Sequence, residues 1–211
     1  MADIEETGLD AAGDFFRQYG KPLSIAAGVL AVAGVGTLLW QQSKATRIEN
    51  AEKAYFAAQT SASQGNPALA KADLEKVATR YAGTNAGDRA TLVVAQLLLD
   101  EGKTAEAVKQ LEALRAAGGE DRLGSTLSTA LAAAYENLGK ATDAAAEYEK
   151  AATLAASDQE KAQRRADAAR AYVSAGQKAK AKEIWAALAQ DESGVMAQEA
   201  RVRLGELEYT P

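Results

Sequence analysis

The 211-residue chain contains no cysteine and no histidine. These absences exclude disulfide bonds, the common zinc and haem ligands, and every catalytic triad that needs a thiol or an imidazole. Only three prolines interrupt the chain and aromatic residues make up 6% of it, whereas 47% of the residues are hydrophobic, most of them alanine. Because alanine is the best helix former and proline the strongest helix breaker, this composition predicts an all-α protein.

Positive charge is also scarce. The 24 lysines and arginines are outnumbered by 29 acidic residues, so the net charge is −5 at pH 7. An acidic chain without a basic stripe has little electrostatic attraction for nucleic acid. The sequence also shows no arrangement of nucleophile, acid and base. We therefore expect no nucleic-acid partner, no cofactor or metal, no small-molecule substrate and no enzymatic activity.

What the chain does have is a repeat of 37 residues, marked by Gly65, Gly102, Gly139 and Gly176. Other positions keep fixed distances from each glycine. Alanine lies seven residues before it (Ala58, Ala95, Ala132, Ala169) and five residues after it (Ala70, Ala107, Ala144, Ala181). A large apolar residue lies nine residues after it (Leu74, Leu111, Tyr148, Trp185), and an apolar residue lies twelve residues after it (Val77, Leu114, Ala151, Leu188). A period of this length indicates a solenoid of helical hairpins. Each glycine is expected to end a first helix in the left-handed conformation, and the repeated apolar positions are expected to form the core.

The repeat resembles the tetratricopeptide repeat, most closely where Tyr135, Gly139, Ala144, Tyr148 and Ala151 follow one another at that family's spacing. The period of 37 instead of 34 residues is a departure. The resemblance implies a right-handed α-solenoid of about four helical hairpins with a C-terminal capping helix. We assign residues 44–211 to this domain, in repeats at about 51–87, 88–124, 125–161 and 162–198, with a cap at 199–209.

Residues 22–43 form a stretch of 22 residues without a charge. A helix of this length spans roughly 30 Å, which matches the hydrocarbon core of a bilayer. Three aromatic residues precede the stretch and a fourth lies near its end, as expected at membrane interfaces: Phe15, Phe16 and Tyr19, and Trp40. The sequence therefore predicts one transmembrane helix at residues 22–43, after a short acidic tail at residues 1–21.

The alternatives to an anchor are a cleaved signal peptide and a buried core helix. A cleaved signal peptide is disfavoured by the acidic tail and by an apolar run longer than that of a signal peptide. A buried core helix is disfavoured because the segment is apolar on every face. The few lysines and arginines on either side do not decide the orientation of the helix.

The layout as a whole adds a second resemblance, carried by the run from Phe16 to Lys21, the single membrane helix, and residues 50–59 at the start of the repeats. It is similar to the YfgM-like ancillary subunit of the SecYEG translocon. This resemblance implies a single-pass protein of the bacterial inner membrane, with its N-terminus in the cytoplasm and its repeats in the periplasm. It also implies an adaptor that binds translocon subunits, periplasmic chaperones or nascent envelope proteins. The alternative is a scaffold for another envelope assembly, such as cell-wall, pilus or cytochrome biogenesis machinery.

In tetratricopeptide arrays the first helices of the hairpins line a groove that binds the partner. The corresponding positions here are Tyr55, Gln59, Arg89, Leu92, Gln96, Leu99, Asn137, Arg170 and Val173. The lysines and asparagines with which that family clamps a carboxylate are not reproduced, and Asn137 alone matches. An extended or helical segment with apolar anchors and an acidic group would suit these residues. A solvated face without any ligand is the alternative that the sequence leaves open.

Overall fold

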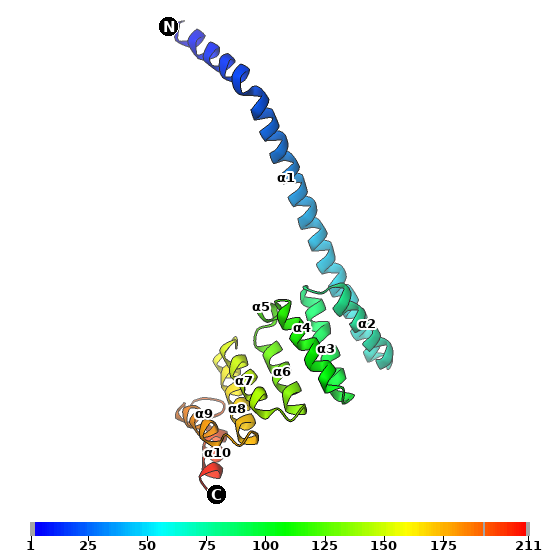
Figure 1. Ribbon diagram of the computed structural model, residues 1–211, viewed down its shortest axis with the longest axis vertical. Helices are drawn as coiled ribbons and strands as arrows, with labels where there is room; N and C mark the ends of the chain where they lie inside the picture. Colours follow the sequence, from blue (N-terminus) through cyan, green and yellow to red (C-terminus); the bar gives the residue numbers. More distant parts are fainter. Residues whose placement is uncertain (1–2, 192, 210–211) are drawn as a thin grey trace. The chain divides into compact units, whose positions relative to one another are not determined.

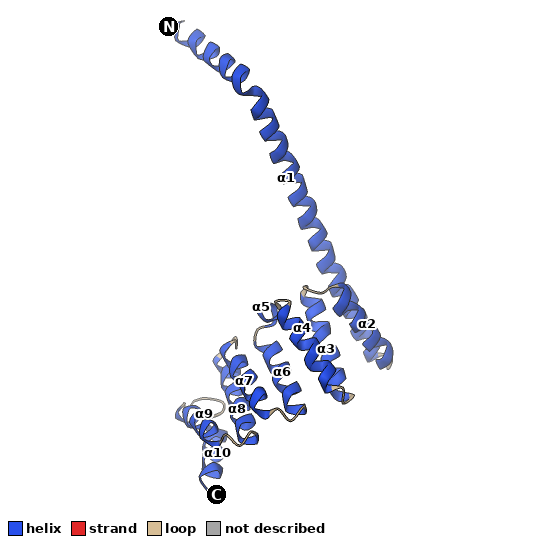
Figure 2. Cartoon of the chain, viewed as in Figure 1, coloured by secondary structure: helices blue, strands red, loops and turns tan. Residues whose placement is uncertain are grey.

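A computed structural model describes the backbone of residues 3–191 and 193–209, and the side chains of Leu30, residues 33–191 and residues 193–208. All regular elements in these ranges are helices, which agrees with the composition (Figure 2). The chain divides into two compact units, residues 1–49 and residues 50–211.

The first unit is helical, as part of α1 (Asp3–Ser63). Leu38, Leu39 and Trp40 are all exposed, Trp40 by 65%. The Nζ atom of Lys44 lies 5.4 Å from the centroid of the Trp40 ring, in cation–π geometry. This part of the chain therefore presents large apolar side chains outward.

The predicted membrane span lies partly outside the fully described residues. Phe15, Phe16 and Tyr19, and ten of the 22 side chains of residues 22–43, belong to the part whose side chains are not described. Among the described residues, no helical stretch combines the length and the apolar character needed to cross a bilayer.

The second unit is a stack of helical hairpins (Figure 1). The end of α1 pairs with α2 (Pro67–Arg80). The later pairs follow along the chain: α3 (Asn85–Asp100) with α4 (Thr104–Ala116); α6 (Ser125–Asn137) with α7 (Ala141–Thr153); and α8 (Asp158–Ser174) with α9 (Lys178–Gln190). Helix α10 (Ala197–Tyr209) packs against α9, and α4 packs against α6. The all-helical solenoid that the period predicts is confirmed.

The four periodic glycines end the first helices, as predicted. Gly65, Gly102, Gly139 and Gly176 have φ between 72° and 80°, a region that costs other residues about 1 kcal/mol or more. At Gly139 the glycine N–H donates to the carbonyl of Glu136 at 2.9 Å, and the next N–H donates to the carbonyl of Tyr135 at 2.9 Å. These two bonds form a Schellman motif, which recurs at the other three glycines.

The repeated apolar positions form the core. All sixteen of the alanine and large apolar positions that define the repeat are buried. All of them except Ala70 and Ala151 belong to two clusters of buried side chains, one centred on α3 and α4 and the other on α7, α8 and α9. The prediction that these residues serve packing is confirmed.

Helix starts differ from one hairpin to the next. Asn66 and Pro67 stand at the N-cap and first helical positions of α2, and the Asn66 side chain makes no capping hydrogen bond. Thr84 and Ser157 cap α3 and α8 instead, since each hydroxyl accepts a backbone N–H three residues later. Among α2 to α9, the long first helices α3 and α8 are therefore the ones with side-chain caps.

A short helix, α5 (Gly119–Leu123), interrupts the regular alternation between α4 and α6. Its Arg122 forms an ion pair with Asp88 on α3, using both guanidinium Nε and Nη2. Asp88 is almost fully buried, so the ion pair compensates for removing this side chain from water. The pair ties α5 to the start of the second hairpin.

Candidate functional site

The predicted groove positions lie on the first helices of the hairpins: Tyr55 and Gln59 on α1; Arg89, Leu92, Gln96 and Leu99 on α3; Asn137 on α6; Arg170 and Val173 on α8. We call this surface the first-helix face. The structure gathers its residues into an N-terminal cluster and a C-terminal cluster and leaves Asn137 apart from both.

The N-terminal cluster centres on Tyr55, which is only 5% exposed. The Arg89 guanidinium carbon lies 4.5 Å from the centre of its ring, and Gln59 donates a hydrogen bond of 3.1 Å to its hydroxyl. The carboxylate of Glu52 lies 3.7 Å from Arg89. Arg89 is therefore a stacked and charge-balanced residue rather than an isolated cation.

The remaining residues of α3 serve different purposes. Leu92 and Leu99 are half-buried and pack against the core, so they offer only part of their surface to a partner. Gln96 is exposed and donates to Asp100 at 2.9 Å within its own helix. Asn137 on α6 likewise donates to the carbonyl of Ala133 within its own helix, at 2.9 Å. Asn137 therefore does not share a hydrogen bond with the predicted groove residues of α3.

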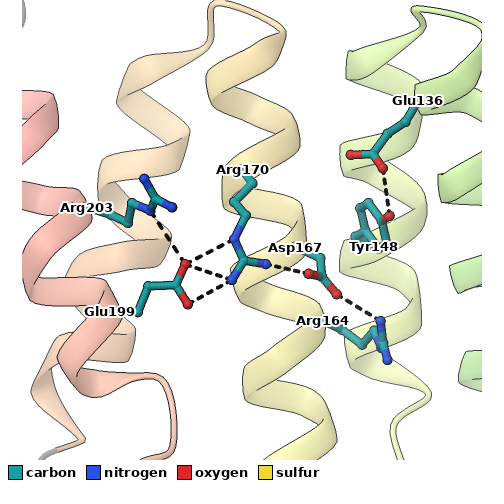
Figure 3. Close-up of polar contacts among 7 residues, drawn as sticks. All are labelled: Glu136, Tyr148, Arg164, Asp167, Arg170, Glu199 and Arg203. Atoms are coloured by element: carbon teal, nitrogen blue, oxygen red, sulfur yellow. Dashed lines mark hydrogen bonds and ion pairs between the residues drawn. The ribbon is translucent and has the colours of Figure 1, made fainter.

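The C-terminal cluster is a chain of ion pairs centred on Arg170 (Figure 3). Its Nη2 donates to both carboxylate oxygens of Glu199 at 2.8 Å, and its Nη1 donates to Asp167 at 2.6 Å. Asp167 also accepts a bond of 2.8 Å from Arg164, and Arg203 lies 3.5 Å from Glu199. Bidentate geometry of this kind is among the stronger forms of ion pair, so it fixes α10 against α8.

A pocket of about 330 Å³ opens beside this cluster, between α8, α9 and α10. Trp185, which is 1% exposed, and Leu207 supply its apolar lining, and Val173, which is 39% exposed, stands at its edge. The guanidinium carbon of Arg170 lies 5.8 Å from the centre of the Trp185 ring. Arg170 and Val173, two of the predicted groove residues, therefore line one pocket.

A larger pocket of about 520 Å³ lies between α2, α3 and α4. Its walls include Ala78 on α2 and Gln110 on α4. One repeat later the equivalent positions are Arg115 and Glu147, which form an ion pair of 2.8 Å between α4 and α7. The pocket therefore lies where the first two hairpins carry shorter and uncharged side chains.

Two tyrosines join consecutive hairpins by the same hydrogen bond. Tyr135 donates to Glu112 at 2.7 Å, and Tyr172 donates to Glu149 at 2.9 Å. The bond to Glu112 raises the pKa of Tyr135 to about 12, and burial followed by the bond to Glu149 raises the pKa of Tyr172 to about 12. In the second hairpin Leu98 takes this place, so the bond is absent there.

Sequence reasoning missed the cluster members on α10, Glu199, Arg203 and Leu207. Leu207 could have been found, because it stands 37 residues after Arg170, whereas neither Glu199 nor Arg203 stands 37 residues after a predicted groove residue. Glu52 carried a usable signal, because it stands 37 residues before Arg89 and has the opposite charge.

Comparisons with known proteins agree with this architecture. Residues 13–209 match the model of a tetratricopeptide repeat-like domain. A kinesin light chain protein of Podosopora anserina with nearly identical TPR-like repeats is 20% identical, with a TM-score of 0.60 over 76% of this chain and 86% of that one. A tetratricopeptide repeat protein from Parabacteroides merdae is 14% identical, with a TM-score of 0.59 over 76% of this chain and 60% of that one. A search of curated proteins finds no match.

Proposed function

Since the matched residues cover most of the sequence, the chain belongs to the tetratricopeptide repeat-like family, and from this premise we propose that it is a membrane-anchored adaptor that binds other proteins. Repeats of this kind present extended surfaces built from successive units. The observation that carries the proposal is the first-helix face. It keeps Gln59, Gln96 and Val173 exposed while neighbouring side chains on the same helices form the core.

The anchor in this proposal is the uncharged stretch at residues 22–43. Its length suits a bilayer, and the exposed Trp40 with Lys44 over its ring is a combination suited to a membrane–water interface. Only six residues of sequence, 44–49, separate the stretch from the repeat unit. Tethering would raise the effective concentration of the repeats near a membrane-bound partner, so a weak contact could still be occupied.

We further propose that the partner belongs to the SecYEG export machinery, and that the repeats lie in the periplasm beside it. The support is the resemblance in layout to the YfgM-like subunit. The fold and the mixed first-helix face are compatible with translocon subunits, periplasmic chaperones or emerging substrates. In this proposal the protein performs no chemistry and acts by binding.

Site-specific crosslinking from the first-helix face tests the partner. A photoreactive residue at Gln59 or Gln96 should crosslink to channel subunits or to periplasmic chaperones in intact cells. The matched control is the same residue at Lys76, whose side chain is 73% exposed on α2. Equal crosslinking from Lys76 would contradict the choice of face. Crosslinks confined to another envelope assembly would replace the export proposal with the scaffold alternative.

Protease treatment tests the anchor and its orientation. Protease added to spheroplasts should digest the repeats from outside, and deletion of residues 22–43 should release the chain from the membrane fraction. Protection in spheroplasts together with digestion in inverted vesicles would place the repeats in the cytoplasm. An intact chain found in the aqueous fraction without detergent would contradict the anchor itself.

A further inference from the structure

The pocket between α2, α3 and α4 lies at a position that the next junction fills with its own charged side chains. At the junction of α4, α6 and α7, Arg115 forms an ion pair of 2.8 Å with Glu147, and Lys150 donates to Glu120 at 2.5 Å. The first junction has neither ion pair, so a volume of about 520 Å³ is open there. The residues 37 positions before these four all line the pocket: Ala78, Gln110, Ala113 and Gly83.

Glu75, on the α2 side of this pocket, differs from its equivalents in the later repeats. The glutamates one and two repeats later each accept a hydrogen bond from a tyrosine of the following hairpin. Leu98 stands in the place of that tyrosine in the second hairpin, so the phenol donor is missing. Within the described residues the exposed Glu75 side chain forms no hydrogen bond or ion pair. Lys103 interacts with it electrostatically but donates its hydrogen bond to Glu101.

The lining of the pocket combines fixed apolar walls with hydrogen-bond acceptors. Val94 and Leu114 are buried in the core and supply apolar surface. Of the described residues that line the pocket, none is lysine or arginine, and the two charged ones, Glu75 and Asp88, are acidic. Asp88 already has its ion pair with α5, whereas Glu75 and the half-buried amide of Gln110 accept no hydrogen bond from the described residues. An aliphatic stem that ends in donors alone matches both features.

From this comparison we infer that the pocket between α2, α3 and α4 binds an arginine side chain of a partner polypeptide. The stem packs on Val94 and Leu114, and the guanidinium donates to Glu75 and Gln110, since its planar fork can bond two acceptors at once. Arg115 fills the equivalent place from within the chain one repeat later. No lining residue belongs to the first-helix face, so this is a second contact surface. The inference rests on the proposed function, because it presumes a polypeptide partner.

Disulfide capture gives a direct test, because the chain has no cysteine of its own. Thr79→Cys places a single thiol at the pocket, and Ala116→Cys places one at the equivalent position of the filled junction; both positions are exposed. Each full-length variant, in phosphatidylcholine nanodiscs and a glutathione buffer, is equilibrated with the peptide acetyl-Cys-Gly-Arg-Leu-amide. Two further peptides carry citrulline or norleucine in place of arginine, and mass spectrometry measures the mixed disulfide.

The two thiols should respond differently to the three peptides. Thr79→Cys should capture the arginine peptide about fivefold more than either of the others, which is the upper range for an exposed ion pair. Ala116→Cys should capture all three alike, because the chain already fills that junction with Arg115 and Lys150. Citrulline keeps the shape of arginine without its charge, and norleucine keeps only an apolar stem.

Matched variants in the Thr79→Cys background assign the preference to the carboxylate. Glu75→Gln should abolish the preference for arginine over citrulline, because it removes the negative charge in the lining. Glu106→Gln, at an exposed glutamate of α4 outside the lining, should change that preference less than about twofold. Circular dichroism should show the same helix content in all variants.

Filling the pocket from within the chain tests the site by a second route. Ala78→Arg combined with Gln110→Glu leaves the number of lining carboxylates balanced by a new guanidinium and introduces the pair of the next junction. Added to Thr79→Cys, this change should lower capture of the arginine peptide to the level seen with Ala116→Cys.

The inference would be overturned if Thr79→Cys captured the three peptides equally, or if Ala116→Cys showed the same preference for arginine. A preference that survived Glu75→Gln, or the filled pocket, would place the binding elsewhere. Disulfide-linked dimers of the Thr79→Cys chain in place of peptide capture would make a second copy the occupant and refute the inference.

The adaptor function is tested separately by crosslinking from Gln59 and Gln96 against Lys76, because none of these three residues lines the pocket. Crosslinks from the first-helix face together with equal capture of the three peptides would leave the adaptor function standing and refute the pocket inference alone. Selective capture of the arginine peptide without any crosslink from the first-helix face would have the opposite meaning.

Discussion

The tyrosines that join the hairpins should make the solenoid sensitive to alkali. Tyr135 donates to Glu112 and Tyr172 donates to Glu149, and the pKa of each tyrosine is raised to about 12. Burial and the carboxylate of Glu136 also raise the pKa of Tyr148. In every case the protonated phenol is favoured in the folded chain, because a phenolate would face a carboxylate or lose its hydration.

The direction of the effect on stability follows from these shifts. An unfolded tyrosine has a pKa near 10, so the stabilisation is complete below about pH 10 and is lost as the pH rises through 12. At pH 11 a shift of about two units would cost up to about 1.4 kcal/mol per tyrosine. Allowing for solvent screening at the hydroxyls of Tyr135 and Tyr172, we expect about 1 kcal/mol each, or about 2 kcal/mol together.

Urea unfolding followed by circular dichroism at pH 8 and pH 11 measures this loss, and absorbance at 295 nm counts the phenolates that form. Tyr135→Phe and Tyr172→Phe should each lower the stability at pH 8 by about 1 kcal/mol, because a hydrogen bond is removed. Each should also reduce the loss between pH 8 and pH 11 by about 1 kcal/mol, because one raised pKa is gone. The comparison with the parent chain cancels the deprotonation of lysines in the same range.

Replacing the acceptors separates charge from hydrogen bonding. Glu112→Gln and Glu149→Gln keep an acceptor but remove the negative charge, so each partner tyrosine should titrate at a lower pH than in the parent chain. The reasoning is refuted if the two Tyr→Phe variants lose as much stability between pH 8 and pH 11 as the parent. It is also refuted if they leave the number of phenols that ionise above pH 11 unchanged.

Three further predictions concern the repeat architecture. Gly139→Ala should cost about 1 kcal/mol in urea unfolding because its φ is 72°, whereas Gly205→Ala, helical and without a close neighbour, should gain about 0.5 kcal/mol; equal effects would contradict the role of the left-handed turn. Ala78→Arg combined with Gln110→Glu should reproduce the ion pair of the next junction, with a coupling energy of about 0.5 kcal/mol in a double-mutant cycle; zero coupling would show that the junctions differ in geometry. Arg122→Met should lower the thermal midpoint by several degrees, because it leaves the buried aspartate of α3 unpaired; an unchanged midpoint would contradict that role.

The hairpins could be predicted because their determinants are local and periodic. A glycine that ends a helix imposes a turn through its own φ, and an alanine five residues later lies inside the next helix interface whatever the rest of the chain does. Gly139 and Ala144 carry this information in the third repeat, and the same pair recurs in the others. Helix α5 could not be predicted in this way, because it occurs once and its place depends on the contact of Arg122 with Asp88.

The ion pairs of the first helices show the same difference between contacts that follow the repeat and contacts that do not. Arg89 and Glu52 occupy the same position in successive repeats, so the stacking of units brings them together and the sequence contains the signal. Arg170 and Glu199 are 29 residues apart, across the loop that precedes α10. Because this separation is not the repeat distance of 37 residues, the partner of Arg170 depends on how α10 docks. Sequence spacing alone does not specify it.

These pairings change what a partner must supply. The sequence places Arg89 and Arg170 among the predicted groove positions, but Glu52 and Glu199 already neutralise them. An acidic group on a partner would have to displace one of these carboxylates, and exchanging one ion pair for another yields little free energy. Burying an apolar side chain against Trp185 has no such competitor and is worth about 2 kcal/mol. Affinity at this face should therefore come from apolar contact, with charge setting the orientation of the bound segment.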